Sequence, residues 1–461
     1  MSLSVQIKNN WLFATEKYER IFGIEEIRTQ PILQWYFGAS ILFFFLTFST
    51  WLNSSSITVE DAQRGSAVCW PYFQSCWKLF FFHDLSVDYS RSIFYMVLYG
   101  ILALIVYSMW RRKWTQAHAL LALLWLWEVA VAFIFAYSIT APFYYYHAFL
   151  TAILLFVPYK EYFLKIAFVL FYFLSVTIKF DDGWVLGTYF TTLKTGLPIF
   201  PDALTPLFTN IVIFSQVIGC WFLLSTRRLL QRSALVFFTF FHLYSGTFVQ
   251  YMYPTAALPP LLILFGPLYR HTPTPFSRKS IAGWLLLVCI CIFQVLGFIT
   301  PGDRRLTLEG NRFGMFMFEA NHECVITATI YERGAHGLNS SWEAPMGTPC
   351  TNLYCMTATS ATVYATTTVI TEQYESGSSL YRCDPYNWWQ RYKIRCANNP
   401  LTERVALQFD HSINGGPFYR IVDTQNICAE NYQVFTHNPW ILLPPQAQID
   451  GYPVQDYYHS D

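Results

Sequence analysis

A lysine and two histidines lie inside long apolar stretches of the sequence, where ionisable side chains are rare. Lys179 lies at the end of one stretch, His147 near the start of another and His242 in the middle of a third. An ionisable group in a membrane-length stretch costs free energy and is a functional candidate by default. Burial penalises the ammonium form of a lysine, so such a side chain can be neutral and act as a base or nucleophile. The histidines could orient a second reactant or stabilise a developing anion.

Each of these residues also has a structural interpretation. Lys179 could reach the membrane interface and pair with Asp181 or Asp182. His147 could cap neighbouring backbone, and His242 could be a core histidine. The same pattern would serve the proton relay of a transporter. The sequence contains no phosphate-binding loop, Ser/His/Asp arrangement or metal-ligand motif, so we expect no metal site.

The composition indicates the class of protein in which these residues are placed. Charged residues make up 13% of the 461 residues, against about 25% in a soluble domain, and aromatic residues make up 19%. This excludes a cytosolic enzyme and a disordered chain. Lysine and arginine number 30 against 29 acidic residues, so the chain has no net field for nucleic acid. We expect a polytopic α-helical membrane protein, with the lipid bilayer as its first partner.

About nine stretches are candidates for membrane spans: 32–51, 92–110, 116–139, 142–158, 162–180, 205–226, 233–252, 255–268 and 281–301. With the N-terminus in the cytoplasm, the cytoplasmic segments hold 15 of the 30 lysine and arginine residues. The connections between spans on the opposite side hold only five: Arg64, Lys78, Arg91, Lys179 and Lys194. The positive-inside rule therefore favours the N-terminus inside and the C-terminus outside. We expect a cytoplasmic segment 1–31, a transmembrane domain 32–302 and an extracytoplasmic domain 303–461.

The cysteines agree with this orientation. Three of the 11, Cys220, Cys289 and Cys291, fall in predicted spans. The other eight all fall on the predicted outside: Cys69, Cys76, Cys324, Cys350, Cys355, Cys383, Cys396 and Cys428. Even numbers of cysteines in an oxidising compartment indicate disulfides, although six in one domain leave the pairing open. Cys69 or Cys76 could also bond to the C-terminal domain.

The C-terminal domain is predicted to be β-rich and disulfide-stapled. Residues 312–318, 323–331 and 361–371 are rich in β-branched and aromatic residues, which favours strands. Residues 334–358 and 374–386 have loop composition. The segment 400–413 begins with proline and is followed by two glycines, which predicts a short helix.

Five ordered motifs resemble the vitamin K-dependent γ-carboxylase family, in the group of membrane proteins with a horizontally transferred transmembrane (HTTM) domain. Tyr145-Tyr146-His147-Ala148-Phe149-Leu150 is similar to the Asn-His segment of the family. Ile178-Lys179-Phe180-Asp181-Asp182-Gly183-Trp184 resembles the segment that holds the catalytic lysine, and Phe241-His242-Leu243-Tyr244-Ser245-Gly246 resembles the Phe-His segment. Arg312-Phe313-Gly314-Met315-Phe316-Met317 and Leu407-Gln408-Phe409-Asp410-His411 resemble two motifs of the C-terminal domain. Order and spacing are kept over roughly residues 20–440.

The resemblance implies a reaction and its parts. The family couples oxidation of reduced vitamin K, or another naphthohydroquinone, by O2 to addition of CO2 at a peptide glutamate, without a metal. Lys179 would be the base and His147 would lie near the carbanion and CO2. The residues His242, Tyr146, Trp184 and Tyr244 would line the quinone site. The partner would be a glutamate-containing exported peptide, and the membrane either a bacterial inner membrane or the endoplasmic reticulum. Water must be excluded, because it would reprotonate the carbanion.

Two of the motifs depart from the family pattern. Tyr146 replaces an asparagine, and Gly314 and Phe316 stand near where the family has a Trp-Arg pair. The six cysteines of the C-terminal domain also differ from the usual smaller homologues. The alternative is therefore a non-carboxylating HTTM protein that binds a quinone or lipid, or serves as a subunit for envelope assembly or peptide export.

Overall fold

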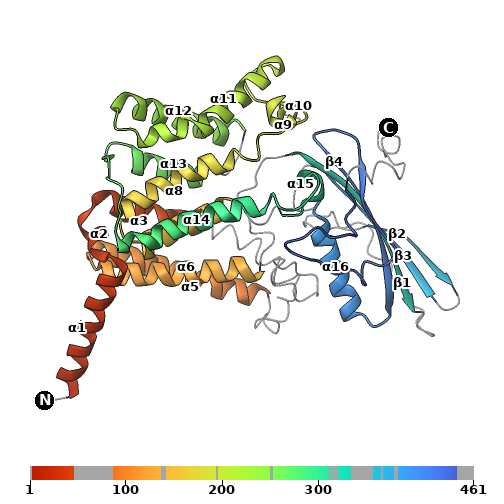
Figure 1. The fold of residues 1–461 in the computed structure, drawn as a ribbon. Helices are drawn as coiled ribbons and strands as arrows, with labels where there is room; N and C mark the ends of the chain where they lie inside the picture. Colours follow the sequence, from red (N-terminus) through yellow and green to blue (C-terminus); the bar gives the residue numbers. More distant parts are fainter. Residues whose placement is uncertain are drawn as a thin grey trace.

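The protein has a helical part and a C-terminal part built around a sheet (Figure 1). The structure, a computed structural model, describes residues 3–45, 87–135, 142–193, 196–249, 253–310, 314, 320–333, 357–364, 367–377 and 383–443. We call residues 3–302 the helical part and residues 303–443 the C-terminal part. Cys69, Cys76, Cys350, Cys355 and the predicted strand 312–318, apart from residue 314, lie outside the described residues.

The helical part contains long helices joined by short ones. Its elements are α1 (Leu3–Phe22), α2 (Ile24–Thr29), α3 (Pro31–Phe43), α5 (Val87–Trp110), α6 (Trp114–Phe135), α7 (Pro142–Phe156), α8 (Lys160–Ser175), α9 (Asp182–Val185), α10 (Thr188–Thr191), η4 (Asp202–Leu204), α11 (Thr205–Val217), η5 (Gly219–Leu224), α12 (Arg228–Thr247), α13 (Tyr253–Phe265), η6 (Arg278–Ser280) and α14 (Ile281–Leu296).

Among the described residues, two helical stretches are long and apolar enough to cross a membrane: Ser92–Trp110 and Arg278–Leu296. Less than a third of each is buried in the protein, which is compatible with a membrane protein. Three other apolar helices are shorter. The helices α7, α11 and α13 have 15, 13 and 13 residues, below the roughly 20 that a span needs. The expectation of about nine spans is therefore not supported by the described helices.

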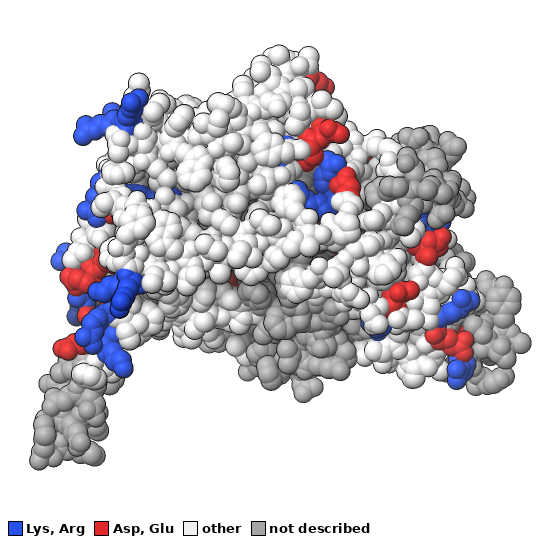
Figure 2. Space-filling view, in the orientation of Figure 1, with Lys and Arg blue, Asp and Glu red and all other residues white. Residues whose placement is uncertain are grey.

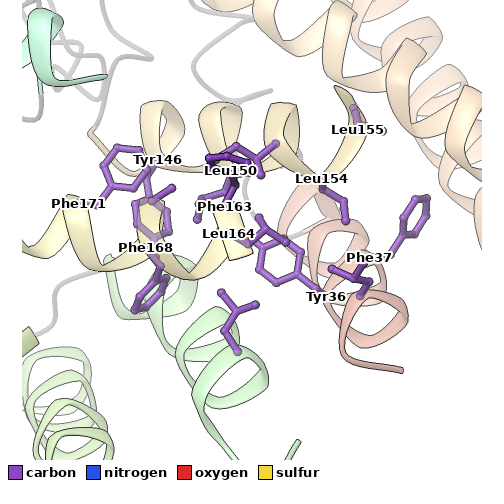
Figure 3. Packing of buried hydrophobic residues seen from close by; sticks show 14 of the residues in the cluster. Tyr36, Phe37, Tyr146, Leu150, Leu154, Leu155, Phe163, Leu164, Phe168 and Phe171 are labelled. Carbon is purple, nitrogen blue, oxygen red and sulfur yellow. The ribbon is translucent and has the colours of Figure 1, made fainter. Parts of the chain in front are cut away.

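Helix α8 lies at the centre of the helical core. Twelve of its 16 residues are buried. Figure 3 shows aromatic and leucine side chains of α8 packing against those of α7 and α3. Charged side chains gather toward the two ends of the helical part, and few lie on the surface between them (Figure 2). Such a distribution suits a protein whose middle faces an apolar medium.

Charged groups hold the N-terminal end of α8. The carboxylate of Glu26 accepts hydrogen bonds from the backbone N–H groups of Tyr159 and Lys160, at 3.0 and 2.9 Å. These N–H groups belong to the first turn of α8, where no intrahelical acceptor exists. Segment 1–31 is thus packed onto the helical core through α2, whose Ile24 and Ile27 are buried in it.

The C-terminal part contains a five-stranded antiparallel sheet. Its strands are β1 (His322–Arg333), β2 (Thr357–Tyr364), β3 (Thr367–Gly377), β4 (Thr402–Ile413) and β5 (Tyr419–Thr424), in the order β2-β3-β1-β4-β5. The short helix α15 (Arg304–Thr307) precedes the sheet, and α16 (Pro385–Asn398) packs against β4. The predicted strand 323–331 is confirmed as β1. The predicted strand 361–371 proves to be two strands, β2 and β3.

The helix predicted at 400–413 is wrong, because this segment is the strand β4. The leading proline and trailing glycines suggested helix ends, but burial alternates at Val405, Leu407 and Phe409, as it does along a strand. The helix lies instead just upstream. Asp384 accepts a hydrogen bond from the N–H of Tyr386 and Pro385 takes the first helical position, so α16 begins with two standard start signals.

Two cysteine pairs of the C-terminal part are bonded. Cys324 pairs with Cys383 and Cys396 with Cys428, with Cα–Cα separations of 5.5 and 6.1 Å. Cys383 precedes α16 and Cys396 lies in its last turn, so both ends of this helix are tied to neighbouring segments. In the helical part, Cys220 is buried as expected, whereas Cys289 is exposed.

Candidate functional site

Lys179 lies in a turn just after α8, and its side chain is 4% exposed. Its Nζ donates a 2.6 Å hydrogen bond to Oε1 of Gln216 on α11 and lies 4.7 Å from the ring centroid of Trp184. Among the described residues, no carboxylate pairs with Lys179. Asp181 bonds instead to Arg305. The structure therefore does not contain the expected ion pair between Lys179 and Asp181 or Asp182.

Lys179 forms part of the wall of a large apolar cavity. The cavity has a volume of about 560 Å³. Trp184, Gln216 and Tyr244 line it together with Lys179, and the rest of the lining is mostly phenylalanine and aliphatic side chains from α11 and α12. Tyr244 donates a hydrogen bond from its hydroxyl to the carbonyl of Pro198. We call this space the lysine cavity.

The lining of the lysine cavity includes residues of the protein surface. Ile211, Phe240 and Phe248 line the cavity and are 40%, 68% and 50% exposed. These side chains come from α11, from α12 and from the residue after α12. An apolar ligand could therefore reach the lysine cavity from the apolar surface between α11 and α12.

His147 lines a second cavity of about 390 Å³. Its Nδ1 lies 3.4 Å from Oε1 of Glu128 on α6, and its Nε2 lies 3.2 Å from the hydroxyl of Thr151 one turn further along α7. The ring of Phe43 stacks on the imidazole at a centroid distance of 3.9 Å. His147 and Glu128 are 6% and 2% exposed. We call this space the histidine cavity.

His242 and Tyr146 also line the histidine cavity. The Nε2 of His242 is hydrogen-bonded to the hydroxyl of Tyr172 on α8. The Nδ1 of His242 and the hydroxyl of Tyr146 are buried and have no hydrogen-bond partner among the described residues. A buried polar atom without a partner costs free energy, so both atoms are suited to receive a ligand.

The six predicted site residues thus fall into two neighbouring groups. Lys179, Trp184 and Tyr244 line the lysine cavity, whereas His147, Tyr146 and His242 line the histidine cavity. Leu243 and Thr247 of α12 line both cavities, so one turn of this helix separates them. The predicted residues are close in space, but the structure does not gather them around a single cavity.

Two polar residues of the site were missed in the sequence. Glu128 is an acidic residue within the apolar stretch 116–139, and Gln216 is an amide within 205–226. The rule that flagged Lys179 applies equally to Glu128 and would have found it. Gln216 carries no charge, so its place beside Lys179 becomes evident only in the folded structure. Within the described residues, no group of three histidine, cysteine or acidic residues could hold a metal ion.

Comparison of the chain with protein-family models, with characterised proteins and with solved structures gave no match, so the description of these two cavities rests on their own geometry.

Proposed function

We propose that the chain is a membrane enzyme in which Lys179 acts as a base on a lipid-soluble hydroquinone. The observation that carries this proposal is the environment of the lysine. Its amine is buried in the wall of an apolar cavity and bonded to a neutral amide, with no described carboxylate to hold the ammonium form. A lysine in such a site favours its neutral form, which has a lone pair for proton transfer.

The lysine cavity fits a naphthohydroquinone. Its volume of about 560 Å³ lies within the usual range for ligand sites, and its aromatic walls suit a flat ring. Phe240 and Phe248 would admit the ligand from the bilayer. Gln216 would take one N–H of Lys179, which leaves the lone pair of Nζ free to accept a phenolic proton. Trp184 would shield the amine from water.

We propose that the overall reaction carboxylates a glutamate of an exported peptide. The hydroquinone would supply the reducing equivalents with which O2 is consumed, one oxygen atom entering the quinone epoxide and the other leaving as water. CO2 would form the new carbon–carbon bond at the γ-carbon of glutamate, which loses one proton. His147, buried and apart from the surface, would lie near this carbon. The assignment of vitamin K, CO2 and glutamate follows the resemblance of the sequence motifs.

The topology belongs to the same proposal. A membrane-embedded helical part, with the N-terminus in the cytoplasm and the C-terminal part outside, would place the disulfides in an oxidising compartment and the exported peptide beside the C-terminal part. The membrane would be a bacterial inner membrane or the endoplasmic reticulum.

A second candidate is a protein that binds a quinone or lipid without reaction, or assists envelope assembly. It is favoured by Tyr146, which lines the histidine cavity at a position where the resembling family has an amide. The same apolar walls would hold such a ligand.

The test is turnover by purified protein in lipid nanodiscs with reduced vitamin K, labelled bicarbonate and a short glutamate-containing peptide. We expect γ-carboxyglutamate and quinone epoxide from the wild type and neither from Lys179→Ala. The matched control is Lys279→Ala, which changes an exposed lysine far along the chain. Formation of epoxide without carboxylation would support the role of Lys179 as a base and contradict the proposed reaction of the peptide. Absence of both products with several hydroquinones would favour the binding protein.

A further inference from the structure

The described part of the segment that carries Lys179 contains no long helix that could hold the lysine in place. Among its described residues, the stretch between α8 and α11 forms only α9 and α10, of four residues each, and the three-residue 3-10 helix η4. On the helical side, Asn210 donates to the carbonyl of Val185 and Gln294 donates to the hydroxyl of Thr177, at 2.8 and 3.0 Å. Two single-turn helices cannot be stable by themselves, because helix nucleation is unfavourable. Other contacts must hold Lys179 and Trp184 at the cavity wall.

An ion pair provides the first of these contacts. Arg305 of α15 lies 3.0 Å from Oδ1 of Asp181, and both side chains are mostly buried. Asp303 orients the guanidinium by a two-pronged hydrogen bond. Asp181 in turn caps α9 by accepting a hydrogen bond from the N–H of Trp184. Arg305 therefore acts on the residue that begins the helix of Trp184, two positions after Lys179.

The pKa of Asp181 supports the importance of this ion pair. Burial raises the pKa of the Asp181 carboxyl, and the positive charge of Arg305 opposes that rise. Without Arg305, Asp181 would lose its charge more readily. A neutral carboxyl is a weaker acceptor for the N–H groups at the start of α9.

The start of β1 and the turn after β4 provide further contacts. The side-chain amide of Asn321 donates to the carbonyl of Tyr189 and to the hydroxyl of Thr192, the latter at 3.0 Å. Asn414 holds Asn321 by accepting from its N–H at 2.9 Å. A Cβ added at Gly183 would lie 2.7 Å from Nδ2 of Asn414. Glycine thus permits this close approach of the two parts.

We propose that Arg305, Asn321 and Asn414 form a clamp through which the C-terminal part positions Lys179 and Trp184 at the wall of the lysine cavity. The catalytic role of this positioning rests on the proposed function. The clamp residues touch no reacting atom, so they are positioning residues. In the helical part α9 packs against α11, while the C-terminal part contacts the start of α9 through Arg305 and α10 through Asn321.

The experiment compares Arg305→Ala, Arg305→Lys and Asp181→Asn in nanodiscs, with Arg404→Ala as the matched control. Arg404 stacks on Tyr331 at 3.9 Å, within the sheet and away from the clamp. Asp181→Asn keeps an oxygen for the α9 cap and removes the charge. Three quantities are measured: hydrogen exchange of amides 181–193, acylation of Lys179 by an apolar amine-reactive reagent, and the separate kcat and KM for the hydroquinone.

We expect exchange of 181–193 and labelling of Lys179 to rise in Arg305→Ala, to be partly restored in Arg305→Lys, and to stay at the wild-type level in Arg404→Ala. The kcat should fall by about tenfold or more, since small misplacements of a reacting group are costly, with KM nearly unchanged. The double variant Arg305→Ala/Asp181→Asn should be no worse than the more affected single variant.

Unchanged exchange and labelling in Arg305→Ala would overturn the clamp. Increased exchange with wild-type kcat would overturn its positioning role. If the wild type shows no turnover at all, the proposed function fails, and exchange and labelling still decide whether the clamp holds Lys179.

Discussion

The two ends of α8 show two ways to bury a lysine. At its N-terminal end, Lys165 is 1% exposed and lies 2.6 Å from Oε1 of Glu161, which also binds Arg270. Lys160, fully buried, donates to the carbonyls of Leu155 and Val157. Beyond the C-terminal end, Lys179 donates a hydrogen bond to the neutral amide of Gln216 and lines a cavity.

The difference teaches that burial alone does not mark a functional lysine. Lys165 is compensated by a carboxylate and sits in packed protein, so its charge serves the structure. Lys160 binds the carbonyls at the end of α7, where a cation is favoured by the helix dipole. Lys179 has neither kind of compensation. A lysine without a counter-charge, beside a space large enough for a ligand, is suited to exchange a proton.

The largest expected effect is on kcat, and it distinguishes Lys179 from the lysines at the N-terminal end of α8. Lys179→Ala should lower kcat by about a thousandfold or more, the range for loss of a general base, with little loss of stability. Lys165→Met should have the opposite result, a lower melting temperature and a wild-type kcat. Both are checked by turnover and thermal unfolding in nanodiscs. Equal loss of activity in the two variants would contradict the distinction between a catalytic Lys179 and a structural Lys165.

The second effect concerns stability at the N-terminal end of α8. Glu161→Gln should destabilise the protein by about 3 kcal/mol, because it leaves the buried charge of Lys165 without its partner. Denaturant unfolding of the purified protein measures this change. The control is Glu25→Gln, which removes an exposed carboxylate that pairs with Arg28. If Glu161→Gln is as stable as the wild type, Lys165 is not compensated in the way described.

A third effect extends the comparison to buried histidines of the C-terminal part. His322 and His411 lie with Nδ1 and Nε2 3.1 Å apart, and His411 is also bonded to the carbonyl of Leu306. Burial lowers the pKa of both, that of His411 to about 4, although Asp303 opposes the shift at His411 and Arg305 favours it at His322. Unfolded histidine titrates near 6.5, so the unfolded chain binds protons between pH 6.5 and 4 that the folded chain does not.

Stability of the C-terminal part should therefore be complete above pH 6.5 and fall by about 3 kcal/mol or more as the pH drops toward 4. Unfolding followed by near-UV circular dichroism at a series of pH values measures this slope. His322→Asn, which keeps a polar atom near the position of Nδ1, should flatten it. A slope of the same size in this variant would assign the pH dependence to other groups.

The smallest effect tests the neutral partner of Lys179. Gln216→Leu should lower kcat about two- to tenfold, the value of one hydrogen bond, because the amine loses its orientation but keeps its cavity. Gln216→Glu should have a larger effect, since a carboxylate would hold Lys179 as ammonium and make it resemble Lys165. The ratio of the two kcat values is the measurement. A faster Gln216→Glu variant would contradict the role of a neutral lysine.

The sequence could predict the type of most elements and the presence of a C-terminal sheet. Each predicted apolar stretch contains a helix, but helix lengths depend on local breaks, such as the change to a 3-10 helix after Val217. The strand β4 was mistaken for a helix because its end signals fit both structures. Only its pairing with β1 and β5 decides between them.

The candidate site could be predicted residue by residue, but its division into two cavities could not. Motif order placed Lys179, Trp184 and Tyr244 beside His147, Tyr146 and His242. The separating wall depends on which face of α12 each side chain takes. Residues Leu243 and Thr247, which form that wall, carry no chemical signal. The clamp residues come from a distant part of the chain, and sequence gives no contact between Arg305 and Asp181.

The two disulfides around α16 have a consequence for biosynthesis. Cys383 lies just before α16 and Cys396 lies in its last turn, and their partners Cys324 and Cys428 lie before and after the helix in the chain. The Cys324–Cys383 bond can form once residue 383 has been translated, whereas the Cys396–Cys428 bond must wait for residue 428, and both require an oxidant. Protein produced in a reducing cytosol would hold α16 by noncovalent packing alone. Recombinant production should therefore route the C-terminal part into an oxidising compartment.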